Sequence, residues 1–152
     1  MSAIVRQCTV EELEREANFT TLISEYSEYA IKGMPRPVVK MEMYKLLEAT
    51  GNQHLFGAFF GDILIGFMAV LISAIPHYGV LGAFSESLFV AKKYRKTGAG
   101  AQLINMAEEL AKDKGAPGLL ISAPLGGALS SVLPRRGYSA THSIFFKGFC
   151  DA

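Results

Sequence analysis

Apolar and polar residues follow two different periods along the chain, mainly helical before Gln53 and strand-like from Gln53 to Val90. At the start, Ile4 to Cys8 predicts a short strand, and Thr9 followed by Glu12 has the spacing of a capping box. Apolar residues then recur at helical spacing opposite charged ones, so an amphipathic helix should begin after Thr9. The other elements predicted in this half are a second helical piece ending near Tyr26, a proline-rich loop at Gly33–Pro37 and a helix at about Val38–Thr50.

From Gln53 onward the apolar residues form strand-like runs. The segments HLFGAFF and ILIGFMAVLISA flank the two-residue turn Gly61-Asp62 and predict a β-hairpin. A third long strand is expected from Val80 to Val90. The chain then returns to helical spacing, and the remaining predictions are a helix at Gly98–Lys114, a short strand at Leu119–Ser122, a small-residue helix near Leu125–Leu133 and a final strand at Tyr138–Lys147.

This order of elements predicts an α+β fold with a mixed central sheet flanked by helices. No repeat, low-complexity segment or Pro/Gly/Ser-rich linker divides the 152 residues, so residues 1–152 are expected to form a single domain. The most hydrophobic stretch, Ile63–Ile75, is shorter than the roughly 20 residues that cross a bilayer, which argues against a membrane partner.

Charge and cysteine content narrow the function classes. The 15 basic residues nearly balance the 14 acidic ones, and a net charge of +1 gives no broad basic face for nucleic acid. Cys8 and Cys150 lie near opposite ends without metal or redox spacing, and the first residues lack a secretory signal pattern. We therefore expect a cytoplasmic protein with reduced thiols. His54, His77 and His142 are too scattered to suggest a metal site.

The segment between the third long strand and the long helix has the chemistry of an anion site. A strand, a glycine-containing turn and a helix N-terminus follow one another, and the first amides of a helix have no intrahelical acceptors. Gly98 and Gly100 let the backbone approach a ligand closely, while Lys92, Lys93, Arg95 and Lys96 add positive charge. The pattern predicts a polyphosphate ligand, but it lacks the third spaced glycine of a Rossmann fingerprint and the Gly-Lys-Ser/Thr ending of a P-loop.

The stretch SESLFVAKKYRKTGAGAQLI, with Arg95-x-x-Gly98-x-Gly100 between strand and helix, resembles the acyl-CoA pyrophosphate motif of the GNAT acetyltransferases. The resemblance covers nearly the whole chain, because the order of elements also agrees and Gly137-Tyr138 is similar to the Gly-Phe/Tyr pair before the family's last strands. Pro76-His77-Tyr78 ahead of this block is similar to phage-type members of the family.

The resemblance implies acetyl-CoA as the cofactor and assigns its contacts. The pantetheine arm would pair with the backbone of Leu88, Phe89 and Val90, and the pyrophosphate would lie on the amides of a loop made up of Arg95, Lys96, Thr97, Gly98, Ala99, Gly100 and Ala101. Two alternatives stay open: the glycines can form a helix-initiating turn without a ligand, and the lysines can form an ordinary solvated loop.

Acetyl transfer requires a neutral amine, so a general base is expected near the thioester. Glu86 lies on the strand leading into the loop, among apolar neighbours that would desolvate its carboxylate and raise its pKa. The family often has a glutamate base at this position. The alternative is an ordinary strand glutamate at the sheet edge or in a salt bridge.

The family's usual acid, a tyrosine before the Gly-Phe/Tyr pair, is replaced here by Leu133, and the common asparagine earlier in that helix by Gly126. Either the thiolate leaves without an acid, or another donor serves, with Ser122, Tyr138 and His142 as candidates; for Tyr138 a core-packed aromatic is the favoured alternative. The residues that fall where the family builds its acceptor pocket are Tyr26, Tyr29, Met34, Arg36 and Tyr44, although aromatics at helical spacing also belong in cores.

The leading hypothesis is an acetyl-CoA-dependent N-acetyltransferase that transfers the acetyl group to a primary amine of a small molecule or protein by direct attack in a ternary complex. The alternatives are a catalytically weak or inactive CoA-binding module, because of Leu133 and Gly126, and a structural or interaction domain without CoA affinity. The hydrophobic content of 50% also predicts self-association as a homodimer.

Overall fold

The computed structural model describes residues 2–29, 31–35 and 38–149. Its helices and strands follow the predicted order nearly throughout. They are β1 (Ile4–Cys8), α1 (Val10–Glu14), α2 (Phe19–Tyr26), α3 (Met41–Ala49), β2 (Gln53–Phe60), β3 (Ile63–Ile75), β4 (Val80–Val90), α4 (Ala99–Asp113), β5 (Leu119–Leu120) and α5 (Ala128–Val132), with 3-10 turns at Ser27–Tyr29, Pro76–Tyr78, Lys92–Tyr94 and Leu133–Arg136.

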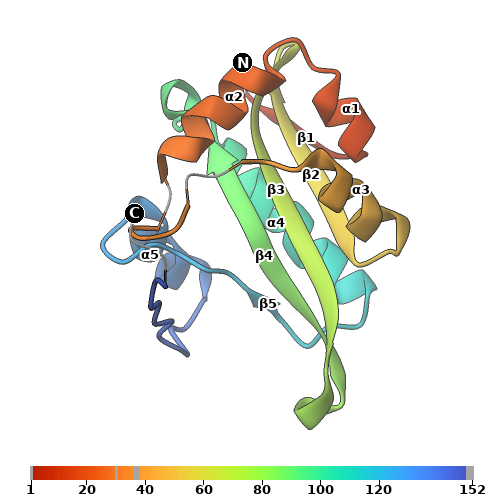
Figure 1. The fold of residues 1–152 in the computed structure, drawn as a ribbon, viewed down its shortest axis with the longest axis vertical. Coiled ribbons are helices and arrows are strands. Elements are labelled where there is room, and N and C mark those ends of the chain that lie inside the picture. Colours follow the sequence, from red (N-terminus) through yellow and green to blue (C-terminus); the bar gives the residue numbers. More distant parts are fainter. Residues whose placement is uncertain (1, 30, 36–37, 150–152) are drawn as a thin grey trace.

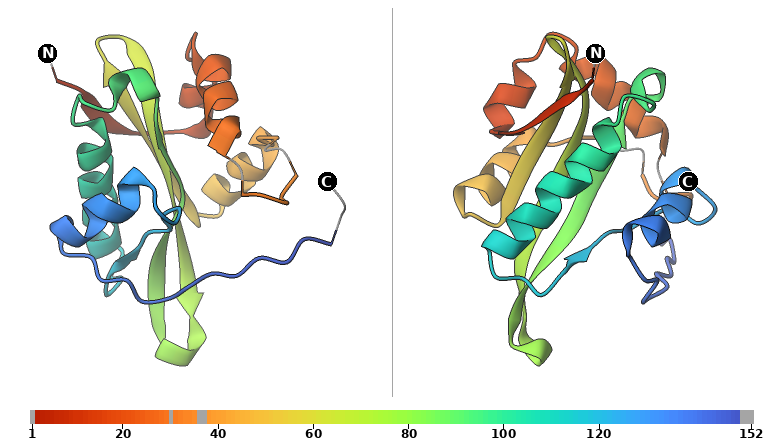
Figure 2. Two further views of the ribbon diagram at one scale, coloured as in Figure 1. Left: turned by 90° about the vertical axis from the view of Figure 1, so that its left-hand side faces the viewer. Right: turned by 180° about the vertical axis from the view of Figure 1, so that it is seen from behind.

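The strands form one mixed sheet in the order β1-β2-β3-β4-β5. The first four pair antiparallel: short turns join β2 to β3 and β3 to β4, whereas α1, α2 and α3 lie between β1 and β2. Strand β5 is added parallel to β4 after the α4 crossover. Helix α4 covers one face of the sheet, and α1, α2 and α3 cover the other (Figure 1 and Figure 2). The predicted α+β class, with a mixed sheet between helices, is confirmed.

Each face of the sheet carries its own core because strand side chains alternate in direction. On the α4 side, Phe56, Met68 and Leu103 are fully or almost fully buried together. On the opposite side, Leu64 and Phe67 of β3 pack with residues of α1 and α2. The central strand β3 therefore reads as a continuous apolar run in the sequence, since both of its faces are covered.

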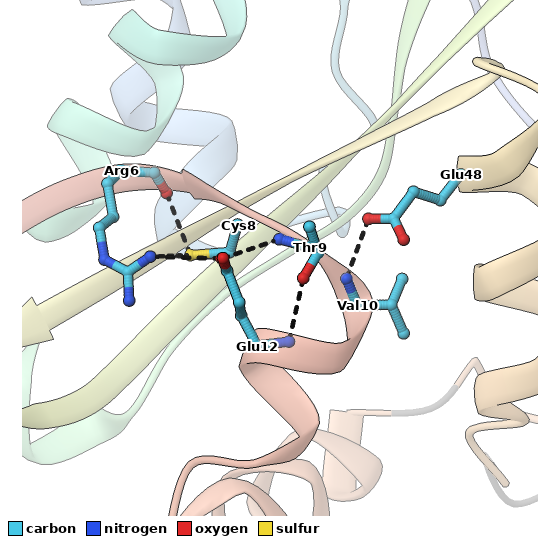
Figure 3. Close-up of polar contacts among 6 residues, drawn as sticks. All are labelled: Arg6, Cys8, Thr9, Val10, Glu12 and Glu48. Carbon is cyan, nitrogen blue, oxygen red and sulfur yellow. Dashed lines mark hydrogen bonds and ion pairs between the residues drawn. The ribbon is translucent and has the colours of Figure 1, made fainter.

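The start of α1 is the capping box that the sequence predicts (Figure 3). The Thr9 hydroxyl accepts from the Glu12 amide, and the Glu12 carboxylate accepts from the Thr9 amide, both at 3.1 Å. A second carboxylate, that of Glu48 on α3, accepts from the Val10 amide at 2.9 Å. Three otherwise unsatisfied amides at the start of the helix are thus paired, and the Val10 amide ties α1 to α3.

Strands β4 and β5 stay together only briefly. Their pairing covers Ala83 with Leu119 and Phe84 with Leu120, and a bond of 3.0 Å from the Ser122 amide to the Ser85 hydroxyl follows. Beyond that point the chain after β5 turns away from β4 (Figure 1). Within the described ranges, residues 87–90 of β4 therefore have a strand partner on the β3 side alone.

Four predicted elements differ from the structure. Helix α3 starts at Met41 rather than Val38, because Lys40 still has an extended backbone. Strand β5 has two residues where 119–122 was predicted, and α5 is shorter than 125–133. The last strand, predicted at 138–147, is wrong: residues 139–149 form no regular element.

The reason for the missing last strand lies in its surroundings. Gly137, at φ 89°, turns the chain, and the Tyr138 hydroxyl is bound to Glu108 of α4 at 2.8 Å. The segment then passes outside β5 from the α4 side toward the α3 side (Figure 2), where the Phe146 ring lies against Gly33. A two-residue edge offers too few hydrogen bonds to hold a ten-residue strand in register, so Phe145 and Phe149 remain 92% and 91% exposed.

Candidate active site

The free edge of β4 leads directly to the N-terminus of α4. Leu88 and Val90 are partly buried and Phe89 is almost fully buried, with its ring packed on Tyr26 and Tyr29 at centroid distances of 5.5 and 5.6 Å. The Phe89 side chain is therefore part of the core, and only its backbone faces the gap beside β5. An extended ligand arm could pair with this backbone as an additional strand would.

The loop that follows presents unpaired amides at the positive end of a fifteen-residue helix. Three amides of the predicted phosphate loop already have acceptors: Arg95 bonds to Lys92, Thr97 to Tyr94, and Ala99 to the Thr97 hydroxyl. Among the described residues, no acceptor is found for the amides of Lys96, Gly98, Gly100 and Ala101. The loop thus offers about every second amide rather than the whole predicted run from Arg95 to Ala101.

The two loop glycines differ in what they contribute. Gly98 caps α4 with φ 84°, a left-handed conformation that glycine adopts without steric cost. Gly100 lies within the helix, and a Cβ added there would meet nothing within 4 Å. Space above Gly100 is what a bound pyrophosphate needs, and the first turn of α4 has no acidic residue to repel it. These observations fit a CoA-type ligand.

The Arg95 side chain turns away from the amides. Its Nε donates to the Val90 carbonyl at 3.0 Å, a terminal nitrogen donates to the Tyr29 hydroxyl at 3.2 Å, and the guanidinium lies over the Tyr29 ring. Nearby, the Lys92 amide donates to Glu25 of α2 at 2.8 Å. Arg95, the charged residue of the sequence motif, therefore links the end of β4 to the turn after α2, and the Lys92 amide links the same region to α2 itself.

Glu86 lies at an irregularity in β4. In the pairing with β3, Ser87 lies opposite Ala69 and Ser85 opposite Val70, which leaves Glu86 without a partner. A bulge of this kind redirects a side chain. The Glu86 carboxylate accepts a hydrogen bond of 3.0 Å from the Tyr44 hydroxyl of α3. The expected desolvation of Glu86 is wrong, because the side chain leaves the apolar layer and is exposed.

Glu86 and Tyr44 border a cavity of about 400 Å³ between α3 and the sheet. The apolar part of its wall includes Met43 and Leu47. Burial raises the pKa of Tyr44 and of Tyr26, and the Glu86 carboxylate raises both further. Both phenols therefore stay protonated near neutral pH, and Tyr44 can keep donating to the carboxylate.

Gln53, the first residue of β2, lies in the same wall and was not predicted as a site residue. It is 1% exposed, and neither polar atom of its carboxamide has a hydrogen-bond partner among the described residues. One sequence signal could have found it. Alternate residues of a strand lie on one face, and here these residues are Gln53, Leu55, Gly57 and Phe59. Gln53 is the single polar side chain among them.

The three alternative proton donors lie in different places. The Tyr138 hydroxyl is held by Glu108 on α4; burial and this bond raise the pKa of Tyr138. His142 is exposed beyond β5 and contacts its neighbour Thr141. Ser122 alone lies beside β4, through the bond from its amide to Ser85. Leu133 is 7% exposed and buried in the turn after α5.

Of the residues predicted for the acceptor pocket, Tyr26 and Tyr44 line the cavity, Tyr29 contacts Arg95 instead, and Met34 is 45% exposed. Arg36 lies outside the described residues.

No three potential metal ligands gather anywhere in the described ranges. In the same ranges, no helix has the length and apolar character needed to cross a bilayer.

A mixed sheet whose fourth and fifth strands separate beside a glycine-capped helix N-terminus is the architecture of the acyl-CoA N-acyltransferases. The sequence model of the acetyltransferase (GNAT) family matches residues 15–124, which is most of the chain. The protein therefore belongs to the acetyltransferase (GNAT) family. This confirms both the family and the enzyme class predicted from the sequence, and acetyl-CoA is the acyl donor that the family generally uses.

Solved structures agree in fold over almost the full length. A ribosomal-protein-alanine N-acetyltransferase from Brucella melitensis biovar Abortus 2308 has a TM-score of 0.75 at 16% identity and covers 98% of this chain and 100% of its own. An aminoglycoside acetyltransferase from an uncultured soil metagenomic sample has a TM-score of 0.75 at 15% identity, covering 97% of each chain. The glucosamine-6-phosphate N-acetyltransferase of Arabidopsis thaliana has a TM-score of 0.75 at 13% identity, covering 99% and 100%.

These three neighbours are named for a protein, an aminoglycoside and a sugar phosphate, so the shared fold does not select an acceptor. No curated protein sequence is significantly similar to this chain.

Proposed function

We propose that the protein is an acetyl-CoA-dependent N-acetyltransferase acting on a primary amine of a small molecule or protein. The observation that carries the proposal is the continuity of three features: the free edge of β4 at 86–90, the unpaired amides beside Gly100, and Glu86 aimed by its bulge at the cavity under α3. An acyl donor bound along the β4 edge and the amides beside Gly100 would bring its acyl group to Glu86 and the cavity.

In this proposal the backbone of Leu88–Val90 orients the pantetheine arm, and the amides of Lys96, Gly98, Gly100 and Ala101 bind the pyrophosphate. Thr97 and Ala99 shape the loop, since their own polar groups are paired within it. Arg95 acts as a brace for β4 and adds positive charge, rather than as a direct phosphate ligand. Acetyl-CoA supplies the thioester that the acceptor nitrogen attacks directly in a ternary complex.

Glu86 is proposed as the general base. A carboxylate can take the proton of an amine, directly or through one water, and the Tyr44 hydroxyl holds one of its oxygens in a fixed direction. Exposure of Glu86 favours a water-mediated route, because solvent reaches it from the cavity. No tyrosine acid is assigned, as Leu133 is buried and the Tyr138 hydroxyl is bound elsewhere.

A CoA-binding module with little or no turnover is the second candidate, and the buried Leu133 at the usual acid position favours it. Two measurements on the purified protein separate the candidates. CoA should raise the thermal midpoint, because a ligand that binds only the folded state stabilises it. Release of free thiol from acetyl-CoA with a panel of primary amines should then show turnover. A midpoint shift without amine-dependent thiol supports the module; no shift at all excludes both.

We also propose a homodimer, and the exposed apolar side chains after α5 support it: Ile144, Phe145 and Phe149 are 83%, 92% and 91% exposed. Sedimentation at micromolar concentrations tests it, and a Phe145→Ser change should favour the monomer. A single species of 16.5 kDa throughout would contradict it. The single domain over 1–152, the phage-type subgroup and the cytoplasmic location stay predictions.

A further inference from the structure

We propose that Gln53 selects acceptors that carry an amide group, so that the substrate class is a primary amine with a nearby carboxamide. The inference rests on the proposed transferase function and deepens it. Its starting point is the Gln53 carboxamide, which is 1% exposed and has no partner for either its oxygen or its nitrogen among the described residues.

Such a group is costly in a folded protein. Buried side-chain amides nearly always have hydrogen bonds, and one that lacks them marks the place of a water, an ion or a ligand. Replacing Gln53 by an apolar residue would remove this cost, and its strand neighbours Leu55 and Phe59 show that apolar side chains pack well on this face. The carboxamide is therefore better explained by something that it binds than by its contribution to the core.

The position of Gln53 indicates what it binds. Gln53 lines the cavity that Glu86 and Tyr44 also border, and two apolar residues of α3, Met43 and Leu47, line the same cavity. A ligand filling this space would place its amine at the Glu86 carboxylate, its carbon chain against the apolar wall and its far end at Gln53.

The chemistry of a carboxamide sets the class of that far end. Gln53 offers one donor group and one acceptor side by side without charge. A primary amide has the complementary pair and can form two parallel hydrogen bonds with it. A carboxylate has no donor for the Gln53 oxygen, and an alkyl group would leave both polar atoms of Gln53 unpaired. Binding sites reject most strongly those ligands that leave buried polar groups unpaired.

Gln53 also borders a second hollow of about 320 Å³, lined by residues that include Gln7 and Cys8 of β1 and His54 of β2. Glu86 and Tyr44 do not line that hollow, so a ligand there would lie apart from the proposed base. Variants of residues that line only one of the two distinguish the hollows. Met43→Trp fills the cavity next to Glu86, whereas Gln7→Ala changes only the second hollow.

The test compares amines of equal size. Glycinamide, 3-aminopropanamide and 4-aminobutanamide are paired with isobutylamine, 3-methylbutylamine and 4-methylpentylamine, in which an isopropyl group replaces the carboxamide. With wild type, the best amide should exceed its isostere about tenfold in kcat/KM, as two net hydrogen bonds imply. Gln53→Leu should reduce this ratio to about one or less, and Met43→Trp should lower use of the amide, while Gln7→Ala should leave the ratio unchanged.

Two results would overturn the inference: equal use of amides and isosteres by wild type, or an unchanged preference in Gln53→Leu. Folding is not a confounding factor, because loss of two unpaired buried atoms should keep or raise the thermal midpoint, and Gln53→Met provides a second apolar variant. If no amine releases thiol although CoA raises the midpoint, the transferase proposal fails by itself. The inference is then decided by the thermal midpoint measured with CoA plus each amino amide, compared with CoA alone. A further rise in wild type that Gln53→Leu abolishes supports the inference, and no further rise in wild type overturns it.

Discussion

Replacing Glu86 by Gln isolates its proposed role as a proton acceptor. The glutamine keeps the length and shape of the side chain, and its carbonyl oxygen can still accept the 3.0 Å hydrogen bond from Tyr44. The cavity and the bulge should therefore be preserved while the basic oxygen is lost. Loss of a positioned base lowers turnover by about a hundredfold, or about 2.7 kcal/mol in the barrier. Tyr44→Phe removes only the bond that orients the carboxylate, so a smaller loss of about two- to tenfold is expected.

Turnover is measured as thiol release over a range of pH with an acceptor established for wild type, and CoA affinity by thermal shift. Glu86→Gln should lose the acidic limb of the pH profile and keep its CoA affinity, because Glu86 lies outside the amide loop. Glu109→Gln, exposed on α4, is the matched control and should behave as wild type. Wild-type turnover in Glu86→Gln would refute the assignment of the base. A large defect in Tyr138→Phe with unchanged CoA binding would instead identify Tyr138 as a residue wrongly set aside.

Four further outcomes are expected. Gly100→Val should leave the thermal midpoint nearly unchanged and weaken CoA binding about tenfold or more, since a side chain enters the open space over the amides; unchanged affinity would exclude this site. Gly98→Val should in addition lower the free energy of unfolding by about 1–2 kcal/mol, because its φ is 84°. Thr9→Ala should cost about 1 kcal/mol in urea denaturation through the lost cap, and no change would show that the α1 end contributes little. The pKa of Tyr138 is raised by burial and by Glu108, so its contribution to stability is complete below the unfolded value of about 10 and is lost as pH rises above it. Thermal melts should therefore show a shallower alkaline decline in Tyr138→Phe, and an equal decline would contradict the shift.

Much of the fold could be predicted because its signals are local. The capping box at Thr9, the turn at Gly61-Asp62 and the helix from Gly98 each depend on residues within one turn of one another. The predicted phosphate loop rests on the same kind of local signal, because its glycines, its charges and the following helix are contiguous in sequence. The sequence could not show which of the loop amides are free to bind a ligand. The Ala99 amide donates to the Thr97 hydroxyl, whereas no acceptor is found for the Gly100 amide among the described residues.

The details that define the candidate site depend on contacts between distant segments. Glu86 could be predicted as a strand glutamate, but its exposure follows from a bulge opposite Ala69 and Val70, and its partner Tyr44 is 42 residues away. The last strand was predicted from apolar residues that would suit a sheet edge, yet β5 provides an edge of two residues and Tyr138 is bound to α4 instead.

Local pattern thus determined most of the elements, their order and the family by itself, and it predicted the anion loop, because caps, turns and periodicity act over a few residues. Tertiary structure alone decided which strand edge stays open and where Arg95 and Glu86 point. It also decided that the buried Gln53 carboxamide has no hydrogen-bond partner in the part of the chain that the structure describes. The physical reason is that pairing register, burial and side-chain hydrogen bonds are set by segments that meet only when the sheet and its two layers of helices assemble.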